Sequence, residues 1–146
     1  MSTFQPEGIT ITINGEDRNL MWDYAVIEKV QDKWGVHPIF AIRDMFWADK
    51  DEEGNEYSHY KAKTIIDLLH ILLNTEVGRR KFFDGMTSLR TYTREEIGYL
   101  VTRQNQDEIV SAITKSWVDS TPEAEPEEPD DEEDIDEDSK KKKRKN

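Results

Sequence analysis

Residues 64–73, TIIDLLHILL, are the most apolar stretch of the chain and decide its fold. Only Thr64, Asp67 and His70 interrupt the leucines and isoleucines, so a helix over this stretch offers almost no face to water. A helix that is apolar nearly all round is buried on several sides. The run is about ten residues long, far short of the roughly 20 that span a bilayer. We therefore predict a core helix over residues 59–74 and no contact with a membrane.

An amino-terminal β-hairpin is predicted before this helix. Isoleucine alternates with threonine over residues 9–13, which is the pattern of a half-buried strand. Asn14 and Gly15 follow, and this pair favours a type I′ turn because both residues tolerate a positive φ. We expect the two strands to cover residues 8–13 and 16–22.

Two helices and a loop are predicted between the hairpin and the core helix. Asp23 is a suitable N-cap for a helix that ends at Gly35, and Pro38 opens a second helix. Residues 49–58 are polar and are expected to form a loop. The apolar members of the second helix are Ile39, Phe40, Ile42, Met45, Phe46 and Trp47.

Two more helices are predicted after the core helix. Gly78 and Gly85 bracket a short segment that separates these helices from the core helix. Thr93 and Glu96 have the spacing of a capping box, which starts the first of the two. The last helix begins near Asn105, and its apolar residues recur every four positions.

The carboxyl-terminal segment has a composition that cannot build a core. Residues 123–138 include 12 acidic residues, and residues 140–145 are all basic. Without these 12 acidic and 6 basic residues, the totals of 32 and 20 fall to 20 acidic and 14 basic residues, a net charge of −6. Such a body argues against nucleic-acid binding, since a phosphate backbone prefers a basic face. The absence of cysteine excludes disulfides, zinc–thiolate sites and cysteine nucleophiles.

The sequence thus predicts an α+β fold, mostly α, with an N-terminal β-hairpin followed by about four to five helices. We assign residues 1–7 to a flexible N-terminus and residues 8–119 to the hairpin and helical domain. Residues 120–146 are assigned to a disordered acidic tail that ends in a lysine run. Residues 1–7 contain no secretion signal, so a cytoplasmic location is expected.

Residues 49–54 resemble the opening of a calcium-binding EF-hand loop. Carboxylates stand at Asp49, Asp51 and Glu53, and the loop lies between two predicted helices. The twelfth position, which supplies a bidentate carboxylate in such loops, is Tyr60. We favour an ordinary solvated loop, with a calcium-dependent regulator as the alternative.

No other motif points to catalysis or to a bound metal. The sequence has no phosphate-binding glycine loop or nucleophile elbow, and its three histidines lack the spacing of metal ligands. Paired carboxylates are common in so acidic a chain and identify no acid–base pair. We therefore expect a protein that is not an enzyme and that needs no cofactor.

Residues 79–83, RRKFF, allow three interpretations. The basic residues and the phenylalanines could contact nucleic acid through phosphates and stacking. Alternatively, the basic residues form a solvated rim while the phenylalanines lie in the core. In the third interpretation, exposed aromatic residues form one patch for a protein partner. The residues of that partner-binding patch are Phe40, Phe46, Trp47, Phe82 and Phe83.

The order of these features over about residues 8–120 resembles the tail assembly chaperones of long-tailed phages. The likeness is one of pattern and size. Its elements are the Ile-Thr-Ile-Asn-Gly hairpin, a helix ending Lys33-Trp34-Gly35, the leucine-rich core helix, the Thr93-Arg94-Glu95-Glu96 cap leading to Gln104-Asn105, and a last helix before a tail rich in proline and glutamate.

The resemblance implies a non-catalytic protein of the host cell cytoplasm that is absent from the mature virion. Such chaperones keep the long tape measure protein soluble and hand it over as tail tube subunits polymerise around it. A longer product, made by a programmed frameshift, is the form expected to contact the tail tube protein. The lysines at 140–143 fit an adenine run on which a ribosome slips. Self-association remains open.

The alternative is a small phage or mobile-element adaptor that binds a regulatory or replication protein. Its gene would lie away from those of the tail tube and tape measure proteins, whereas a chaperone gene would lie beside them. Both alternatives describe an interaction protein.

Overall fold

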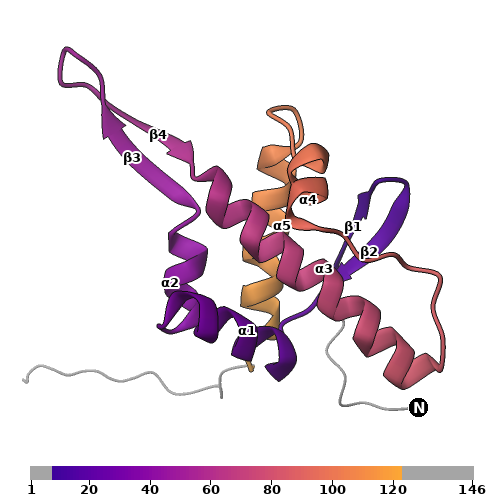
Figure 1. The fold of residues 1–146 in the computed structure, drawn as a ribbon. Helices are drawn as coiled ribbons and strands as arrows, with labels where there is room; N and C mark the ends of the chain where they lie inside the picture. Colours follow the sequence, from indigo (N-terminus) through magenta and orange to yellow (C-terminus); the bar gives the residue numbers. More distant parts are fainter. Residues whose placement is uncertain (1–7, 123–146) are drawn as a thin grey trace, which may run out of the picture.

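The computed structural model describes residues 8–122 of the 146-residue chain. This part of the chain forms four strands and five helices (Figure 1). In chain order they are β1 (Ile9–Ile13), β2 (Glu16–Leu20), α1 (Tyr24–Trp34), α2 (Pro38–Arg43), β3 (Phe46–Lys50), β4 (Glu56–Tyr60), α3 (Ala62–Asp84), α4 (Arg94–Leu100) and α5 (Gln106–Ser120). The predicted fold class, α+β and mostly helical, is confirmed for the described residues. Residues 1–7, the acidic segment and the lysine run lie outside them.

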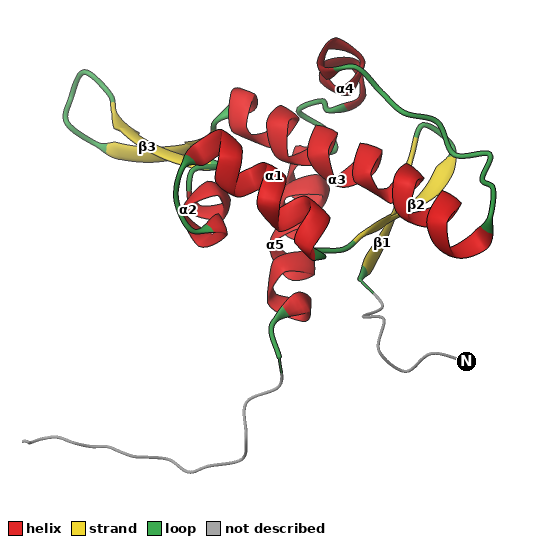
Figure 2. Cartoon of the chain, turned by 60° about the horizontal axis from the view of Figure 1, so that its bottom comes forward, coloured by secondary structure: helices red, strands yellow, loops and turns green. Residues whose placement is uncertain are grey.

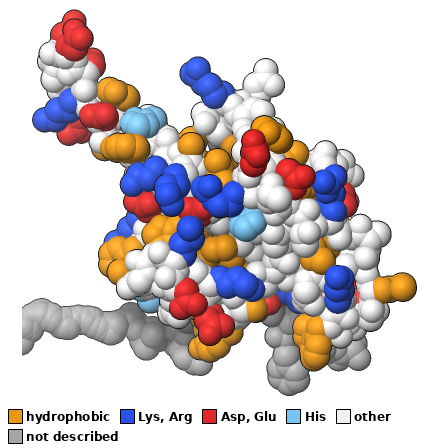
Figure 3. Space-filling view, in the orientation of Figure 1, with side chains coloured by type: hydrophobic (Ala, Val, Ile, Leu, Met, Phe, Trp, Pro, Cys, Tyr) orange, Lys and Arg blue, Asp and Glu red, His pale blue; other side chains and the backbone are white. Residues whose placement is uncertain are grey.

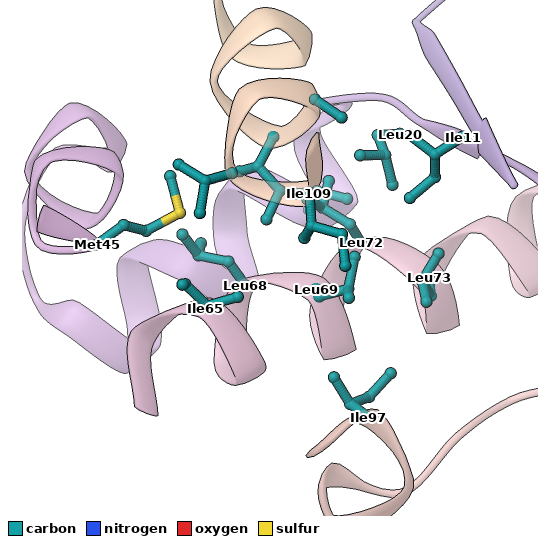
Figure 4. Packing of buried hydrophobic residues seen from close by; sticks show 14 of the residues in the cluster. Ile11, Leu20, Met45, Ile65, Leu68, Leu69, Leu72, Leu73, Ile97 and Ile109 are labelled. Atoms are coloured by element: carbon teal, nitrogen blue, oxygen red, sulfur yellow. The ribbon is translucent and has the colours of Figure 1, made fainter. Parts of the chain in front are cut away.

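Helix α3 lies at the centre of the fold (Figures 1 and 2). Helices α1, α4 and α5 and strand β2 all pack against it. Figure 4 shows Ile97 of α4 on one side of its leucines and Ile109 of α5 on the other. The prediction that residues 64–73 form a core helix is therefore confirmed. The fully buried leucines of this helix are Leu68, Leu69, Leu72 and Leu73.

The core helix starts later and runs further than predicted. The sequence predicts residues 59–74, but α3 covers Ala62–Asp84, and residues 59 and 60 belong to β4 because they pair with β3. Gly78 does not end the helix. Glycine costs a helix about 1 kcal/mol, and the burial of neighbours such as Val77 offsets that cost. The helix ends instead at Gly85, whose φ of 86° is left-handed.

A second hairpin replaces the expected end of the second helix. Helix α2 stops before Asp44, and Phe46 and Trp47 lie in β3 rather than in the helix. The Asp44 carboxylate accepts hydrogen bonds from Lys61 (2.8 Å) and Thr64 (2.6 Å) at the start of α3. These bonds bring the chain back on itself, so the intervening residues form two antiparallel strands.

Half of the predicted loop at residues 49–58 is strand, and residues 51–55 form the turn between the two strands. The carboxylate of Asp51 accepts hydrogen bonds from the backbone N–H groups of Asn55 (2.9 Å) and Glu53 (3.0 Å), which lower its pKa. Gly54 has a φ of 85°, which favours glycine at this position of the turn. An EF-hand needs helices on both sides of its loop. Strands flank this turn, so the structure does not form that unit.

The predicted helix caps are confirmed. The Asp23 side chain accepts a hydrogen bond from the backbone N–H of Val26, and Gly35 ends α1 with a φ of 72°. Thr93 and Glu96 make the reciprocal hydrogen bonds of a capping box at the start of α4. Local sequence therefore sets where these helices begin and end.

The N-terminal hairpin forms around Asn14 and Gly15 as predicted, but its second strand is shorter. Strand β2 ends at Leu20, whereas the prediction extends it to Trp22. The Trp22 indole N–H donates a 2.8 Å hydrogen bond to Ser116 Oγ on α5. Since this bond draws Trp22 toward the last helix, the chain leaves the strand before reaching it.

A buried ion pair joins β2 to α3. Arg18 Nε lies 2.7 Å from Glu76 Oε1, and both side chains are fully buried. The guanidinium also donates to the backbone oxygens of Leu73 (2.8 Å) and Arg90 (3.2 Å), while Glu76 Oε2 accepts from the Asn19 N–H (3.0 Å). The charges are therefore paired and hydrogen-bonded, which a buried ion pair needs in order to be tolerated.

Asp67 of α3 links three helices through its buried carboxylate. Lys63 of α3 (3.0 Å), Lys33 of α1 (3.6 Å) and Arg94 of α4 all pair with it. Burial alone would raise the pKa of the Asp67 carboxyl, but hydrogen bonds from Lys63 and Arg94 and the charge of Lys33 lower it overall. The carboxylate thus joins both α1 and α4 to α3.

Replacing Leu69 with Ala should lower the free energy of unfolding by roughly 2 to 5 kcal/mol, because the substitution leaves a cavity in a fully buried site. Chemical denaturation followed by circular dichroism measures the change. The control is Val118→Ala, which removes methyl groups from an exposed side chain of α5. A loss below about 1 kcal/mol for the Leu69 variant would contradict the central position of α3.

Replacing Asp67 with Asn should make stability less dependent on pH. The lowered pKa of folded Asp67 means that its contribution is present above the unfolded pKa of about 4 and is lost as pH falls through the lower folded pKa. We expect the variant to be less stable by roughly 1 to 3 kcal/mol at pH 7. Denaturation at a series of pH values measures this difference, which should shrink in acid. A difference that grows below pH 4 would contradict the assignment.

Candidate partner-binding surfaces

The five aromatic residues proposed to bind a partner are all exposed. Their exposed fractions are 52% for Phe40, 50% for Phe46, 47% for Trp47, 80% for Phe82 and 58% for Phe83. The interpretation that buries the two phenylalanines of residues 79–83 in the core is therefore wrong. Large aromatic side chains left in water are typical of surfaces that another molecule covers.

These residues do not form the single patch that the sequence suggested. Phe40 lies in α2, and Phe46 and Trp47 lie in the hairpin before α3, whereas Phe82 and Phe83 lie at the other end of that helix. The 20 residue steps from Ala62 to Phe82 span about 30 Å at 1.5 Å per residue. Figure 1 shows the hairpin and the far end of α3 on opposite sides of the molecule. There are thus two separate surfaces, which sequence spacing alone could not distinguish.

The first surface is the β3–β4 hairpin, residues 46–60, called here the arm. It projects from the helices in both Figures 1 and 2. All of its strand residues are exposed except Tyr60, which is half-buried. On one face, the His59 ring stacks between those of Trp47 (5.1 Å between centroids) and Tyr57 (5.6 Å). The arm thus presents a row of three aromatic rings to the surroundings.

The base of the arm is fixed to the body by polar contacts. Tyr60 donates a 2.7 Å hydrogen bond to the Asp107 carboxylate at the start of α5, which raises the pKa of the Tyr60 hydroxyl. The ammonium group of Lys61 binds Asp44 at 2.8 Å and lies 5.1 Å from the centroid of the Trp47 ring. Hydrogen bonds from Lys61 and Thr64 lower the pKa of Asp44. The arm is therefore oriented at its base and exposed beyond it.

The second surface surrounds Phe82 and Phe83 at the end of α3 and is called here the Phe82 groove. The two rings meet edge to face with centroids 5.0 Å apart. They border a cavity of about 360 Å³ that lies between α3 and the start of α1. A side-chain atom added at Gly78 would meet nothing within 4 Å, so this glycine leaves the groove open. The groove offers an apolar edge to an incoming helix or loop.

The basic residues beside this groove are engaged by carboxylates. Arg79 Nε lies 2.8 Å from the Asp23 carboxylate, and the Arg79 side chain is almost buried. Arg80 lies between Glu76 (3.8 Å) and Asp84 (3.2 Å). Two of the three cations of residues 79–81 are thus paired within the protein. This pairing weakens the interpretation that they bind phosphate.

Two of the three histidines, His37 and His59, make structural contacts. His37 Nδ1 accepts a hydrogen bond from the Ile39 N–H (3.1 Å), which caps α2, and its ring meets Trp117 edge to face. His59 stacks within the arm. Within residues 8–122, no three side chains of the metal-binding types come together.

No protein-family model, curated protein or solved structure matches this chain. In the part of the chain that the structure describes, no helix is both long and apolar enough to cross a bilayer. The functional assignment therefore rests on the two aromatic surfaces and on the order of features in the sequence.

Replacing Tyr60 with Phe should loosen the arm without unfolding the body, because it removes the bond to Asp107. We expect faster hydrogen exchange at the backbone amides of Trp47 and His59, with unchanged exchange at Leu69 in the core. Amide exchange followed by NMR measures both. The matched control is Tyr57→Phe, whose hydroxyl lies away from this contact. Equal exchange in the native protein and the Tyr60 variant would show that the bond does not orient the arm.

Proposed function

We propose that this protein is a tail assembly chaperone of a long-tailed phage, which binds the tape measure protein and keeps it soluble while the tail tube assembles. The observation that carries the proposal is the exposure of Phe82 and Phe83 beside an open groove. A holding chaperone needs apolar surface to cover the apolar faces of its client. The order of features from the Ile-Thr-Ile-Asn-Gly hairpin to the tail supports the same assignment.

The charge of the protein supports a holding role. The net charge is −12, and 12 of the acidic residues lie at positions 123–138. A high net charge keeps proteins dispersed by mutual repulsion. A complex in which this protein covers an aggregation-prone client would inherit that charge and stay soluble.

The polar clusters in the described part of the chain favour binding over catalysis. Arg18 with Glu76, and Asp67 with its three cations, join secondary-structure elements and are buried or paired. An active site needs a nucleophile or an acid–base group with access to a substrate. The proposed role is therefore one of binding, carried out by the exposed surfaces of the protein.

The proposed site of action is the host cytoplasm, before the virion is complete. The short form binds the tape measure protein, and contact with the tail tube protein is assigned to a longer, frameshifted form. Whether the codons of the lysine run contain a slippery heptamer followed by an overlapping frame tests the second assignment.

The double substitution Phe82→Ser with Phe83→Ser should weaken binding of a tape measure fragment at least about tenfold, because it removes two aromatic anchors. The fraction of fragment that remains in the supernatant after co-expression and centrifugation measures the holding activity. Tyr99→Ser is the matched control, since Tyr99 is an exposed aromatic residue of α4 outside both surfaces. Equal solubility with the double variant and the control would contradict a client site at the Phe82 groove.

A further inference from the structure

The arm is a two-stranded sheet that lacks the support such sheets need. A hairpin of two strands is at best marginally stable in water, and a third strand or a packed helix normally completes it. Here, the residues of β3 are exposed on both faces, and so are those of β4 before Tyr60. The arm thus offers two open edges and an uncovered aromatic face.

The hydrogen bonds show which backbone groups are available at these edges. The Lys61 N–H donates to Met45 O (2.8 Å), and the Asp51 N–H donates to Asn55 O (3.0 Å). In an antiparallel ladder, hydrogen-bonded pairs alternate with non-hydrogen-bonded pairs. The pair Ala48–Ser58 is therefore non-hydrogen-bonded, and the N–H and C=O groups of both residues point outward. Another strand can pair with either edge without disturbing the hairpin.

The two ends of the arm differ in charge: the far end is acidic, and basic residues lie around the base. Residues 49–56 contain five carboxylates and one lysine, whereas Lys61, Lys63 and Arg103 lie around the base. Of these, Lys61 pairs with Asp44, and Lys63 shares the single carboxylate of Asp67 with two other cations. Figure 3 shows red side chains gathered at the far end of the arm and blue ones around its base. Two arms that pair antiparallel would place the acidic end of each beside the basic end of the other.

The edge of β4 fits this pairing better than the edge of β3. Lysine within an edge strand commonly prevents pairing with another chain. Strand β3 contains Lys50, whereas β4 contains no lysine.

We propose that the edge of β4 joins two copies of this chain into a four-stranded antiparallel sheet, with strand order β3–β4–β4–β3. Ser58 of one copy lies opposite Ser58 of the other, which places Tyr57 beside the other copy's His59. Glu56 then lies beside Tyr60 of the other copy. A cavity of about 650 Å³ beside Tyr60 gives the Glu56 side chain room. Its lining includes Arg103, which carries the opposite charge, and Asp107, whose carboxylate accepts the hydrogen bond of the Tyr60 hydroxyl. The pairing also extends the aromatic row across the dimer.

The proposal is tested by the oligomeric state of the full chain. Sedimentation equilibrium of the native protein should show a monomer–dimer equilibrium that weakens as salt is added. Ser58→Pro removes an outward N–H of β4 and should weaken the dimer at least about tenfold. Ala48→Pro removes the equivalent N–H of β3 and is the matched control, which should dimerise as the native protein does.

A charge exchange tests the assigned partners. Glu56→Lys and Arg103→Glu should each weaken the homodimer. In either variant, residue 56 of each copy meets residue 103 of the other copy with the same charge, and the symmetric dimer contains this contact twice. An equal mixture of the two variants should restore the dimer, since both contacts in the mixed dimer then join opposite charges. Circular dichroism and thermal melting establish that all variants are folded.

Several outcomes would overturn the proposal. They are a native chain that is monomeric at all concentrations, a loss with Ala48→Pro equal to that with Ser58→Pro, and a mixture of charge variants that fails to associate. A monomeric chain that binds tape measure fragment, but loses it with Ser58→Pro, would assign the edge to an extended client segment instead. The dimer does not depend on the Phe82 groove, so the chaperone proposal and this one can fail separately.

Discussion

The ion pair between Arg18 and Glu76 is the contact on which the arrangement of the fold depends. It is fully buried, and its two side chains come from β2 and α3, which are 58 residues apart at this point. A charge left without its partner in such a site costs several kcal/mol, so the pair forms in one geometry or not at all. This requirement fixes the position of the hairpin along α3. Strand β2 then lies against α3 with Leu20 buried in the core.

Other arginines and lysines of the protein are also paired with carboxylates, and this pairing affects the charge of the protein surface. Arg79 binds Asp23, and Lys63 and Arg94 bind the buried carboxylate of Asp67. Because these cations are engaged by carboxylates within the protein, much of the remaining acidic charge is left to face water. Structural ion pairs thus determine where the protein attracts and where it repels other molecules.

Local patterns in the sequence predict most of the fold, but contacts between distant residues decide the rest. The caps at Asp23 and Thr93 depend on neighbouring residues and could be predicted. The β3–β4 hairpin could not, because Phe46 and Trp47 also fit the apolar spacing of a helix, and the bond from Asp44 to Lys61 spans 17 residues. The burial of Arg18 could be predicted in part. Arg18 pairs with Ile11 across the hairpin, so the alternation that buries Ile11 and Ile13 places the Arg18 side chain on the same face. The sequence predicted that the aromatic residues are exposed and form one patch. They are exposed, but the length of α3 separates them into two surfaces.

The contact between the first and last elements has a consequence for biosynthesis. Strand β1 packs against α5, and Trp22 meets Ser116 and Trp117 across 94 residues or more. Chains leave the ribosome from the amino terminus, so the leucines of α3 emerge before the helix that covers them. Closing a contact over so long a stretch is also slow. The nascent polypeptide therefore remains in need of protection until translation has passed α5, because the domain cannot complete its core before that helix has been made.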